Sequence, residues 1–191
     1  MRKFSLDLWG VVGYTRYQLP GELIALATGL LGSTRRNLDD KDRLALVTSH
    51  TDRLTGEVIL VAGADRCIEI HSQDESWDQY QQQLTEAADG QPEEAAFARH
   101  VLGSVQKARP DGQGRVRIDG ELLRWAKIPA EPSEEPRVVL IRGAGNRVEL
   151  WNPAVYDEHL EPFEPSFPAI RGRLRRGGAS QPGSESHEAQ Q

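Results

Sequence analysis

Two aspartate–arginine pairs with the same spacing are the residues of this sequence best suited to binding chemistry. Arg43 follows Asp39 by four positions, and Arg115 follows Asp111 by four. An aspartate can accept hydrogen bonds from the backbone N–H groups of a turn and orient a nearby arginine by its charge. The guanidinium is a planar fork of donors that suits a phosphate group or the O6 and N7 atoms of guanine. The spacing alone favours a simpler interpretation, in which each pair is a salt bridge that holds a turn.

Each pair precedes the same local pattern, a short strand followed by a short helix. After the second pair, Val116 and Ile118 alternate with charged residues, which is the period-2 pattern of a half-buried strand. Residues 121–128 then have an amphipathic helical pattern. After the first pair, Leu44 and Leu46 take the positions of the two apolar strand residues. The two pairs are therefore expected to lie in equivalent turns.

The similarity between the two halves continues downstream. A capping box that opens at Ser49 predicts a short helix ending near Leu54. Residues 58–70 (VILVAGADRCIEI) match residues 138–150 (VVLIRGAGNRVEL) almost position for position, and both predict a strand, a glycine-containing hairpin and a second strand. The second copy has a longer polar connection, residues 130–137, which predicts a surface loop. A repeat of about 75 residues fits a duplicated small domain better than a solenoid unit.

These motifs resemble a known fold. The D-x-x-x-R turn, the alternating strand, the short helix, the V-x-L-V-x-G hairpin and the E-L-W end resemble the AbrB/SpoVT fold. Two tandem copies joined by helices resemble the MraZ family of bacterial transcriptional regulators. The resemblance covers roughly residues 30–160, and its most specific parts are the duplicated D-x-x-x-R, G-R-V at 114–116, V-V-L-I-R-G at 138–143 and V-E-L-W at 148–151. The sequence departs from the family pattern at Asp42, where the family has glycine, and at Val47 and Asp119, where it has proline.

The resemblance implies an α+β, β-rich fold, in which two AbrB-like swapped-hairpin repeats form an intramolecular pseudo-dimer with a helical hairpin between them. It implies binding without catalysis, with the D-x-x-x-R turns on the face that meets double-stranded DNA. The implied DNA contacts are Arg43, Arg115, Lys41, Arg117, Arg35 and Arg36, with Asp39 and Asp111 as the residues that orient the turns. It further implies a ring-like homo-oligomer, nucleoid-associated in the cytoplasm, on promoter repeats upstream of the division and cell-wall gene cluster. Because one chain offers few phosphate contacts, useful affinity is expected to need several linked copies.

The chain is expected to divide into five regions. They are an N-terminal extension (1–29), a first repeat (30–72), linking helices (73–108), a second repeat (109–160) and a disordered Pro-, Arg-, Gly- and Ser-rich tail (161–191). In the extension, charged residues and a proline interrupt the apolar stretches, so we expect neither a signal peptide nor a membrane span. A native start nearer residue 30 is an alternative for this region.

Two helices are expected between the repeats and one after them. Helical spacing of Trp77, Tyr80 and Leu84 predicts the first, and Pro92 suits the first turn of the second, which is expected to run to about Lys107. The expected buried stripe of the second helix is Ala96, Phe97, His100, Val101 and Val105. Asn152 and Pro153 predict the start of a last helix to about Leu160, with Val155 and Tyr156 facing inward. The aromatic residues between the repeats are expected to form core rather than subunit contacts.

Composition narrows the function class. The net charge of −6 argues against a protein that coats DNA without regard to sequence. It does not exclude DNA binding, because basic residues can still cluster on one face. The single cysteine, Cys67, forms no internal disulfide, which fits a reducing cytoplasm. The five histidines have no neighbour at metal-ligand spacing, and no nucleophile or phosphate-binding loop has a surrounding motif. The sequence therefore predicts no enzyme, no metal site and no cofactor.

Two alternatives are open. Asp42, Asp119 and the acidic composition also fit an interaction protein that kept the fold and lost DNA binding. An AbrB-like antitoxin, binding DNA and a toxin, ranks lower because such proteins usually carry one repeat. The basic run RGRLRR at 171–176 predicts either phosphate contacts without sequence preference or a merely solubilising end.

Overall fold

Strands and helices follow one another along the chain in short runs. The computed structural model describes residues 30–46, 54, 56–129 and 137–175. The strands are β1 (Ser33–Asn37), β2 (Arg43–Ala45), β3 (Val58–Ala62), β4 (Ile68–Ser72), β5 (Gln106–Ala108), β6 (Arg115–Arg117), β7 (Val138–Gly143) and β8 (Arg147–Trp151). The helices are α3 (Glu75–Ala87), α4 (Pro92–Gly103), α5 (Gly120–Trp125), α6 (Pro153–Leu160), the 3-10 helix η2 (Glu164–Ser166) and α7 (Phe167–Arg175). The expected α+β, β-rich fold class is confirmed.

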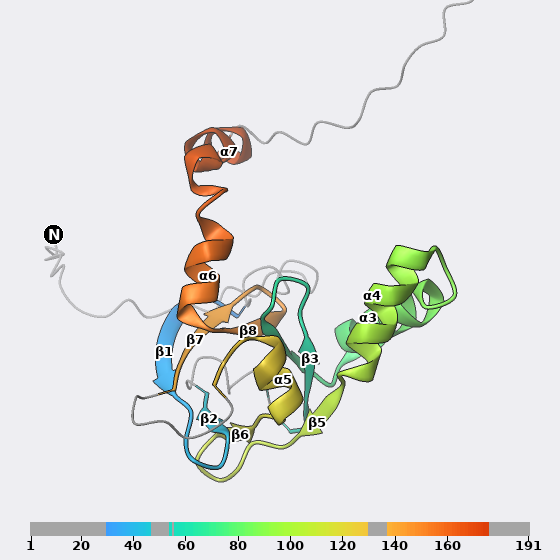
Figure 1. Cartoon of the computed structure of the whole chain (residues 1–191), viewed down its shortest axis with the longest axis vertical. Helices are drawn as coiled ribbons and strands as arrows, with labels where there is room; N and C mark the ends of the chain where they lie inside the picture. The colour runs from blue at the N-terminus through green and yellow to red at the C-terminus, as the bar shows by residue number, and fades with distance from the viewer. Residues whose placement is uncertain (1–29, 47–53, 55, 130–136, 176–191) are drawn as a thin grey trace, which may run out of the picture.

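Six strands form one antiparallel sheet, and two form a separate ribbon. The sheet order is β1–β7–β8–β4–β3–β5, and β2 pairs with β6 (Figure 1). The predicted hairpins β3–β4 and β7–β8 meet through β4 and β8. Strand β1 pairs with β7 from the later half of the chain, whereas β5 pairs back onto β3. Strands from both halves therefore interleave instead of forming two separate sheets.

The register between β4 and β8 relates the two hairpins by an approximate twofold axis. Glu69 pairs with Glu149, and these residues hold matching places in the two similar hairpin sequences. The flanking pairs are Ile68 with Leu150 and Ile70 with Val148. The pairing is thus reciprocal, which is the condition for an isologous contact between two equivalent units.

One apolar core serves both halves. Its fully buried members include Leu44 and Leu60 from the first half and Leu123, Ile141 and Leu150 from the second. The β2–β6 ribbon and the short helix α5 contribute buried side chains to this core together with the large sheet. Burying one such side chain stabilises a fold by about 1.5–3 kcal/mol. Because the core is shared, neither half buries its apolar residues without the other.

The predicted helical hairpin is present between β4 and β5. Asp74 caps α3 by accepting hydrogen bonds from the backbone N–H groups of Ser76 and Trp77, and Pro92 occupies the first turn of α4. Trp77 and Leu84 of α3 pack with Ala98 and Val101 of α4 in a second apolar cluster, which also buries Ile59 and Val61 of β3. Both faces of β3 are therefore buried, which explains its unbroken apolar sequence.

The buried face of α4 differs from the expected one. Of the expected stripe only Val101 is buried, and the helix instead packs through Ala95, Ala98 and Val101. Phe97 remains 41% exposed. Small alanine side chains let two helices approach closely, so packing against α3 selects them over the larger residues. The helix also ends at Gly103, and the chain re-enters the sheet as β5 where we expected helix to Lys107.

The end of the chain contains more helix than the sequence predicted. As expected, Asn152 caps α6 by accepting a hydrogen bond from the Ala154 N–H, and Val155 and Tyr156 pack against Trp151. The unstructured tail expected from residue 161 is wrong for 164–175, which contains η2 and α7. Pro165 and Pro168 lie in the first turns of these helices, where a missing backbone N–H costs nothing. The prolines were therefore compatible with helix.

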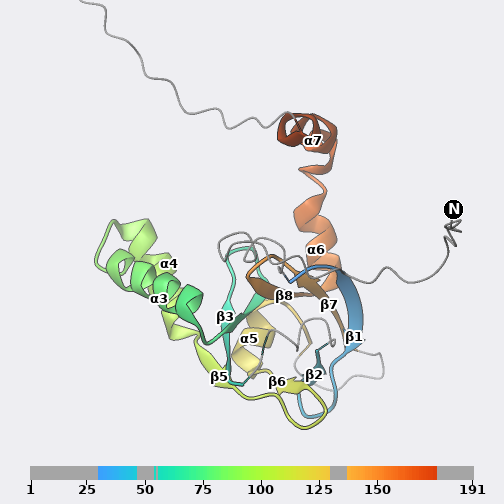
Figure 2. The same cartoon turned by 180° about the vertical axis from the view of Figure 1, so that it is seen from behind.

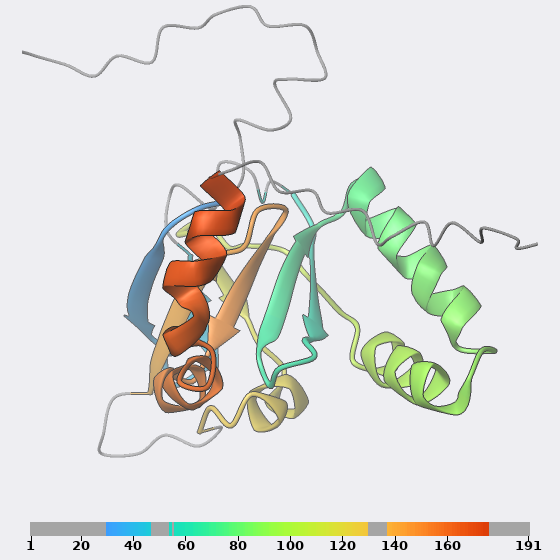
Figure 3. The ribbon, with the colours of Figure 1, turned by 90° about the horizontal axis from the view of Figure 1, so that it is seen from above.

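Two helical projections leave the body on different sides of the sheet. One is the α3–α4 hairpin, and the other is the arm formed by α6, η2 and α7 (Figure 2, Figure 3). In the part of the chain that the structure describes, no helix is long and apolar enough to cross a membrane. The expectations for residues 1–29, for the helix between Ser49 and Leu54, for the loop 130–136 and for residues 176–191 fall outside the described residues.

Candidate nucleic-acid interface

The β2–β6 ribbon brings the two D-x-x-x-R turns together. Its antiparallel register pairs Leu44 with Val116, and both side chains are fully buried in the core. Because successive residues of a strand point to opposite faces, the residues on either side of this central pair face outward. These outward residues are Arg43 and Ala45 on β2, and Arg115 and Arg117 on β6. Three arginines thus share the outer face of a two-stranded ribbon.

The two turns have the same backbone geometry. Asp39 accepts hydrogen bonds from the backbone N–H groups of Lys41 and Arg43, both at 2.9 Å. Asp111 accepts the equivalent bonds from Gln113 at 2.9 Å and from Arg115 at 3.0 Å. These carboxylates therefore fix their turns from the inside, as the sequence predicted.

One residue in each turn adopts a left-handed backbone conformation. Asp42 has φ 57° and Gly114 has φ 69°, and each stands immediately before the arginine. Their carbonyl oxygens accept hydrogen bonds from the opposite half: Ile118 N–H donates to Asp42, and Leu46 N–H donates to Gly114. Each turn is thus bonded to the other half of the ribbon, and aspartate is one of the few residues besides glycine that tolerate this conformation.

Each arginine forms a two-point salt bridge with the aspartate of its own turn. In both pairs, Nε and Nη2 of the arginine lie 2.8 Å from Oδ2 of the aspartate. The Nη1 atom of Arg43 lies 3.9 Å from Asp111, and that of Arg115 lies 3.8 Å from Asp39. The four side chains therefore form one cluster that crosses between the halves, which we call the Asp–Arg cluster. The salt bridges that the spacing favoured are present.

The cluster is fully ionised at neutral pH. Burial opposes ionisation of Asp39, but hydrogen bonds from the Arg43 side chain and from the Arg43 and Lys41 backbone lower its pKa to about 2. Hydrogen bonds from the Arg115 side chain and backbone lower the pKa of Asp111 to about 2 as well. Two positive and two negative charges thus balance one another. Lys41 and Arg117, both exposed beside the cluster, supply this face with further positive charge.

Arg117 lies directly across the ribbon from Arg43. Two like charges at opposed positions of an antiparallel pair repel each other. Asp39 offsets this repulsion by neutralising Arg43 at 2.8 Å. The aspartates therefore allow three arginines to share one small surface.

Asp42, the first departure from the family pattern, is neutralised by a buried arginine. Arg137 is 5% exposed, and its Nη1 donates to Asp42 Oδ1 at 2.7 Å and to the Pro129 carbonyl at 3.3 Å. Its Nη2 donates to the carbonyl oxygen of Asp39. Asp42 thus presents much less negative charge to a ligand than the sequence suggested. Sequence reasoning missed Arg137, whose only signal was a cation at the junction between a polar loop and an apolar strand.

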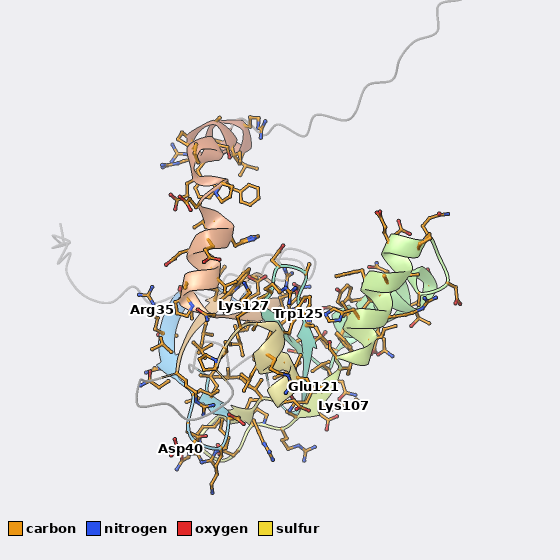
Figure 4. The ribbon with its side chains drawn as sticks, viewed as in Figure 1. Arg35, Asp40, Lys107, Glu121, Trp125 and Lys127 are labelled. Atoms are coloured by element: carbon orange, nitrogen blue, oxygen red, sulfur yellow. The ribbon has the colours of Figure 1, made fainter. Side chains whose placement is uncertain are left out.

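Arg35 and Arg36 belong to the large sheet and not to the β2–β6 ribbon. Both are exposed on β1, which pairs with β7 at one edge of the large sheet. Figure 4 shows Arg35 near the base of α6, whereas Asp40, in the first turn, lies at the lower end of the molecule in that view. The structure brings Arg43, Arg115, Lys41 and Arg117 to one surface, and it does not bring Arg35 to that surface.

A second charged network, which sequence reasoning missed, joins β4 and β8. Glu69 bonds to His71 at 3.0 Å and lies 3.3 Å from Arg147, which also bonds to Glu149 at 2.8 Å. Burial opposes ionisation of Glu69, but the bond from His71 and the charge of Arg147 lower its pKa overall. The network pairs opposite charges at the reciprocal sheet contact. Its residues are separated along the chain, so no local motif marked them.

Comparison with known proteins gives a consistent result. A family model described as "MraZ protein, putative antitoxin-like" matches residues 30–100. The "Transcriptional regulator MraZ" of Halorhodospira halophila is 34% identical over 132 residues, covering 66% of this chain and 82% of the relative. The protein of the same name from Clavibacter michiganensis subsp. michiganensis is 31% identical over 137 residues, covering 72% of this chain and 90% of the relative. The one from Saccharopolyspora erythraea is 29% identical over 147 residues, covering 77% of this chain and 97% of the relative. With this coverage of its relatives and the paired D-x-x-x-R turns in one ribbon, the chain belongs to the MraZ family of transcriptional regulators.

Proposed function

We propose that this protein regulates transcription by binding promoter DNA with the outer face of the β2–β6 ribbon. The observation that carries the proposal is the Asp–Arg cluster, which fixes two guanidinium groups side by side on one surface. Arg43 and Arg115 are the central contacts, and Lys41 and Arg117 extend the surface on either side. Arg35 and Arg36 are secondary, because they lie on β1 rather than on the ribbon.

The salt bridges are compatible with DNA contact. Side chains of Arg43 and Arg115 are 30% and 27% exposed, so each guanidinium keeps an accessible edge. An arginine that is held in place loses less conformational entropy when it binds, because its rotamer is already fixed. Asp39 and Asp111 thus act as positioning residues: they hold the two guanidinium groups in place and also reduce the net positive charge of the surface.

The proposed architecture has two AbrB-like repeats, residues 30–72 and 109–160, joined by the helices of 73–108. The reciprocal β4–β8 register and the equivalent turns support a duplicated unit. One chain presents few cations to DNA, and each neutralised phosphate contributes a slope of only about −0.9 in log K against log salt for duplex DNA. A homo-oligomer, such as a ring, would link several weak contacts on repeated promoter sites upstream of the division and cell-wall gene cluster. This assigns the protein to the cytoplasm, at the nucleoid.

Fluorescence anisotropy tests the proposal. The probe is DNA from upstream of the protein's own gene, beside a scrambled probe of equal length, over a salt series. Arg43→Ala/Arg115→Ala should lose specific binding. If both arginines contact phosphates, the salt slope should fall by about 2; if they read guanine, each should cost about 1–3 kcal/mol for the native probe only.

A matched control distinguishes the loss of these two contacts from a general loss of positive charge. Arg99→Ala/Arg124→Ala also removes two exposed cations, one each from α4 and α5, and should bind as the wild type does. Equal binding of native and scrambled probes by the folded wild type at low salt would contradict the proposal.

The second candidate is an interaction protein without DNA binding. The observation that favours it is the charge balance of the Asp–Arg cluster, in which two aspartates neutralise two arginines. The same titration decides between the two, because this candidate requires wild-type protein that is folded and shows no preference for the native probe.

A further inference from the structure

Helix α7 exposes an apolar face flanked by arginines. Phe167, Ile170 and Leu174 lie at the spacing of one helix face, and they line a shallow groove together with Arg171 and Arg175, which follow its edge. Phe167 is 42% exposed and Leu174 is 74% exposed. The helix contains no acidic residue. An exposed apolar stripe of this kind marks a surface that another molecule covers.

The α3–α4 hairpin has the opposite character. Residues 74–103 contain seven carboxylates and one arginine, and the last turn of α4 adds a histidine. On the outer face of α4, Phe97 is 41% exposed. Glu93 and Glu94, one turn earlier on the same face, are also exposed. This surface is thus an aromatic side chain flanked by carboxylates, the complement of the arginine-flanked groove of α7.

The two surfaces do not meet within one chain. Figures 1 and 3 show α7 and the hairpin projecting from different sides of the sheet. The arm is anchored at its base, where the Tyr156 ring lies 5.2 Å from the Trp151 ring and the Arg142 guanidinium lies 4.4 Å from the Tyr156 ring. Complementary surfaces that face apart on one subunit can meet between two subunits.

We propose that α7 of one subunit docks on the outer face of α4 of a second copy of this chain. Phe167, Ile170 and Leu174 cover Phe97, while Arg171 and Arg175 approach Glu93 and Glu94. The contact is heterologous, because it joins two different surfaces, and each subunit keeps one of each surface free for a further copy. Such contacts close into a ring when the rotation between subunits allows it, and otherwise extend into a filament. The inference deepens the homo-oligomer of the proposed function by assigning the surfaces that build it.

Charge reversal on each side tests the contact without DNA present. Variant A, Arg171→Glu/Arg175→Glu, leaves both surfaces acidic, and variant B, Glu93→Arg/Glu94→Arg, leaves both basic. Light scattering after size exclusion should show the wild type as an oligomer larger than a dimer, with subunit association weakened about tenfold or more in A and in B. An equimolar mixture of A and B should reassemble, because each A–B contact again joins opposite charges.

Two further variants guard the interpretation. Leu174→Asp should also reduce the mass, since it places a charge within the apolar stripe. Lys107→Glu/Arg124→Glu changes the charge by as much as variant A at side chains that are 58% and 66% exposed elsewhere, and it should keep the wild-type mass. Circular dichroism should show all variants folded, because these side chains lie outside the buried cores.

Several outcomes would overturn the inference. A monomeric wild type, unchanged masses in A and B, or a mixture that stays dissociated each contradicts it. If A keeps its mass and loses affinity for DNA or for phosphatidylglycerol vesicles, α7 binds phosphates rather than a second copy. Loss of assembly in A and in B supports the docking, and because DNA affinity is proposed to need linked copies, probe binding should weaken with it. An intact oligomer that does not prefer the native probe contradicts only the proposed function.

Discussion

The two D-x-x-x-R turns reach one geometry by different means. Both require a left-handed residue before the arginine, and the second turn uses Gly114, which has no Cβ to restrict it. The first uses Asp42, whose charge is then held by the buried Arg137 at 2.7 Å. The left-handed residue of the second turn needs no side-chain partner, whereas that of the first is paired with a side chain 95 residues away. Arg137 immediately precedes β7, so we expect the first turn to be coupled to the docking of that strand.

The largest expected effect comes from removing Arg137. Arg137→Met keeps much of the side-chain volume but leaves Asp42 without its partner, together with the carbonyl oxygens of Asp39 and Pro129. Breaking a buried ion pair costs about 3–5 kcal/mol, and we expect about 3 kcal/mol because the Asp42 side chain is 26% exposed. Urea denaturation measures the change in unfolding free energy. In an Asp42→Gly background the cost should be clearly smaller, and an equal cost would show that Arg137 acts independently of the first turn.

An intermediate effect is expected in the second turn. Gly114→Ala introduces a Cβ at φ 69°, which costs about 1–2 kcal/mol. Asp42→Gly provides the reciprocal test: it relieves the same restriction in the first turn but also removes the partner of Arg137, so it should not stabilise the protein. Thermal unfolding of the two variants compares them directly. A stabilised Asp42→Gly protein would mean that the ion pair contributes less than the backbone restriction costs.

The smallest effect is expected on acidification, and it should be shared by both turns. Asp39 and Asp111 each have a folded pKa of about 2, below the usual value of 3.8. A lowered folded pKa means that each salt bridge stabilises the protein above pH 3.8 and that this contribution is lost as the pH falls towards 2. Carboxyl NMR titration should find both midpoints well below the ordinary range, and Asp39→Asn/Asp111→Asn should lessen the pH dependence of unfolding. A normal midpoint at only one of them would break the equivalence of the turns.

Burial of α4 shows where sequence patterns stop being decisive. Its sequence contains two apolar stripes, and the one with the larger residues, including Phe97, was expected to be buried. Helical periodicity identifies such stripes but does not say which one a neighbour will cover. The buried face is that of Ala95, Ala98 and Val101, of which Ala98 and Val101 pack with the α3 side chains Trp77 and Leu84. Phe97 became surface, where it now marks the proposed subunit contact.

Local interactions made the turns and hairpins predictable from the sequence alone, and the fold class followed from the family resemblance of these motifs. A carboxylate that bonds to an N–H group two residues later, or to a guanidinium four residues later, needs no distant partner, so the spacing of Asp39 and Arg43 was sufficient. The alternation in β2 and β6 likewise identified which of their residues are buried. The tertiary structure decided which elements contact one another. It joined the two turns in one cluster, paired Arg137 with Asp42, and left one face of α4 and one face of α7 exposed. Each depends on contacts between residues far apart in the chain, and such contacts are selected by close packing and charge pairing rather than by local pattern.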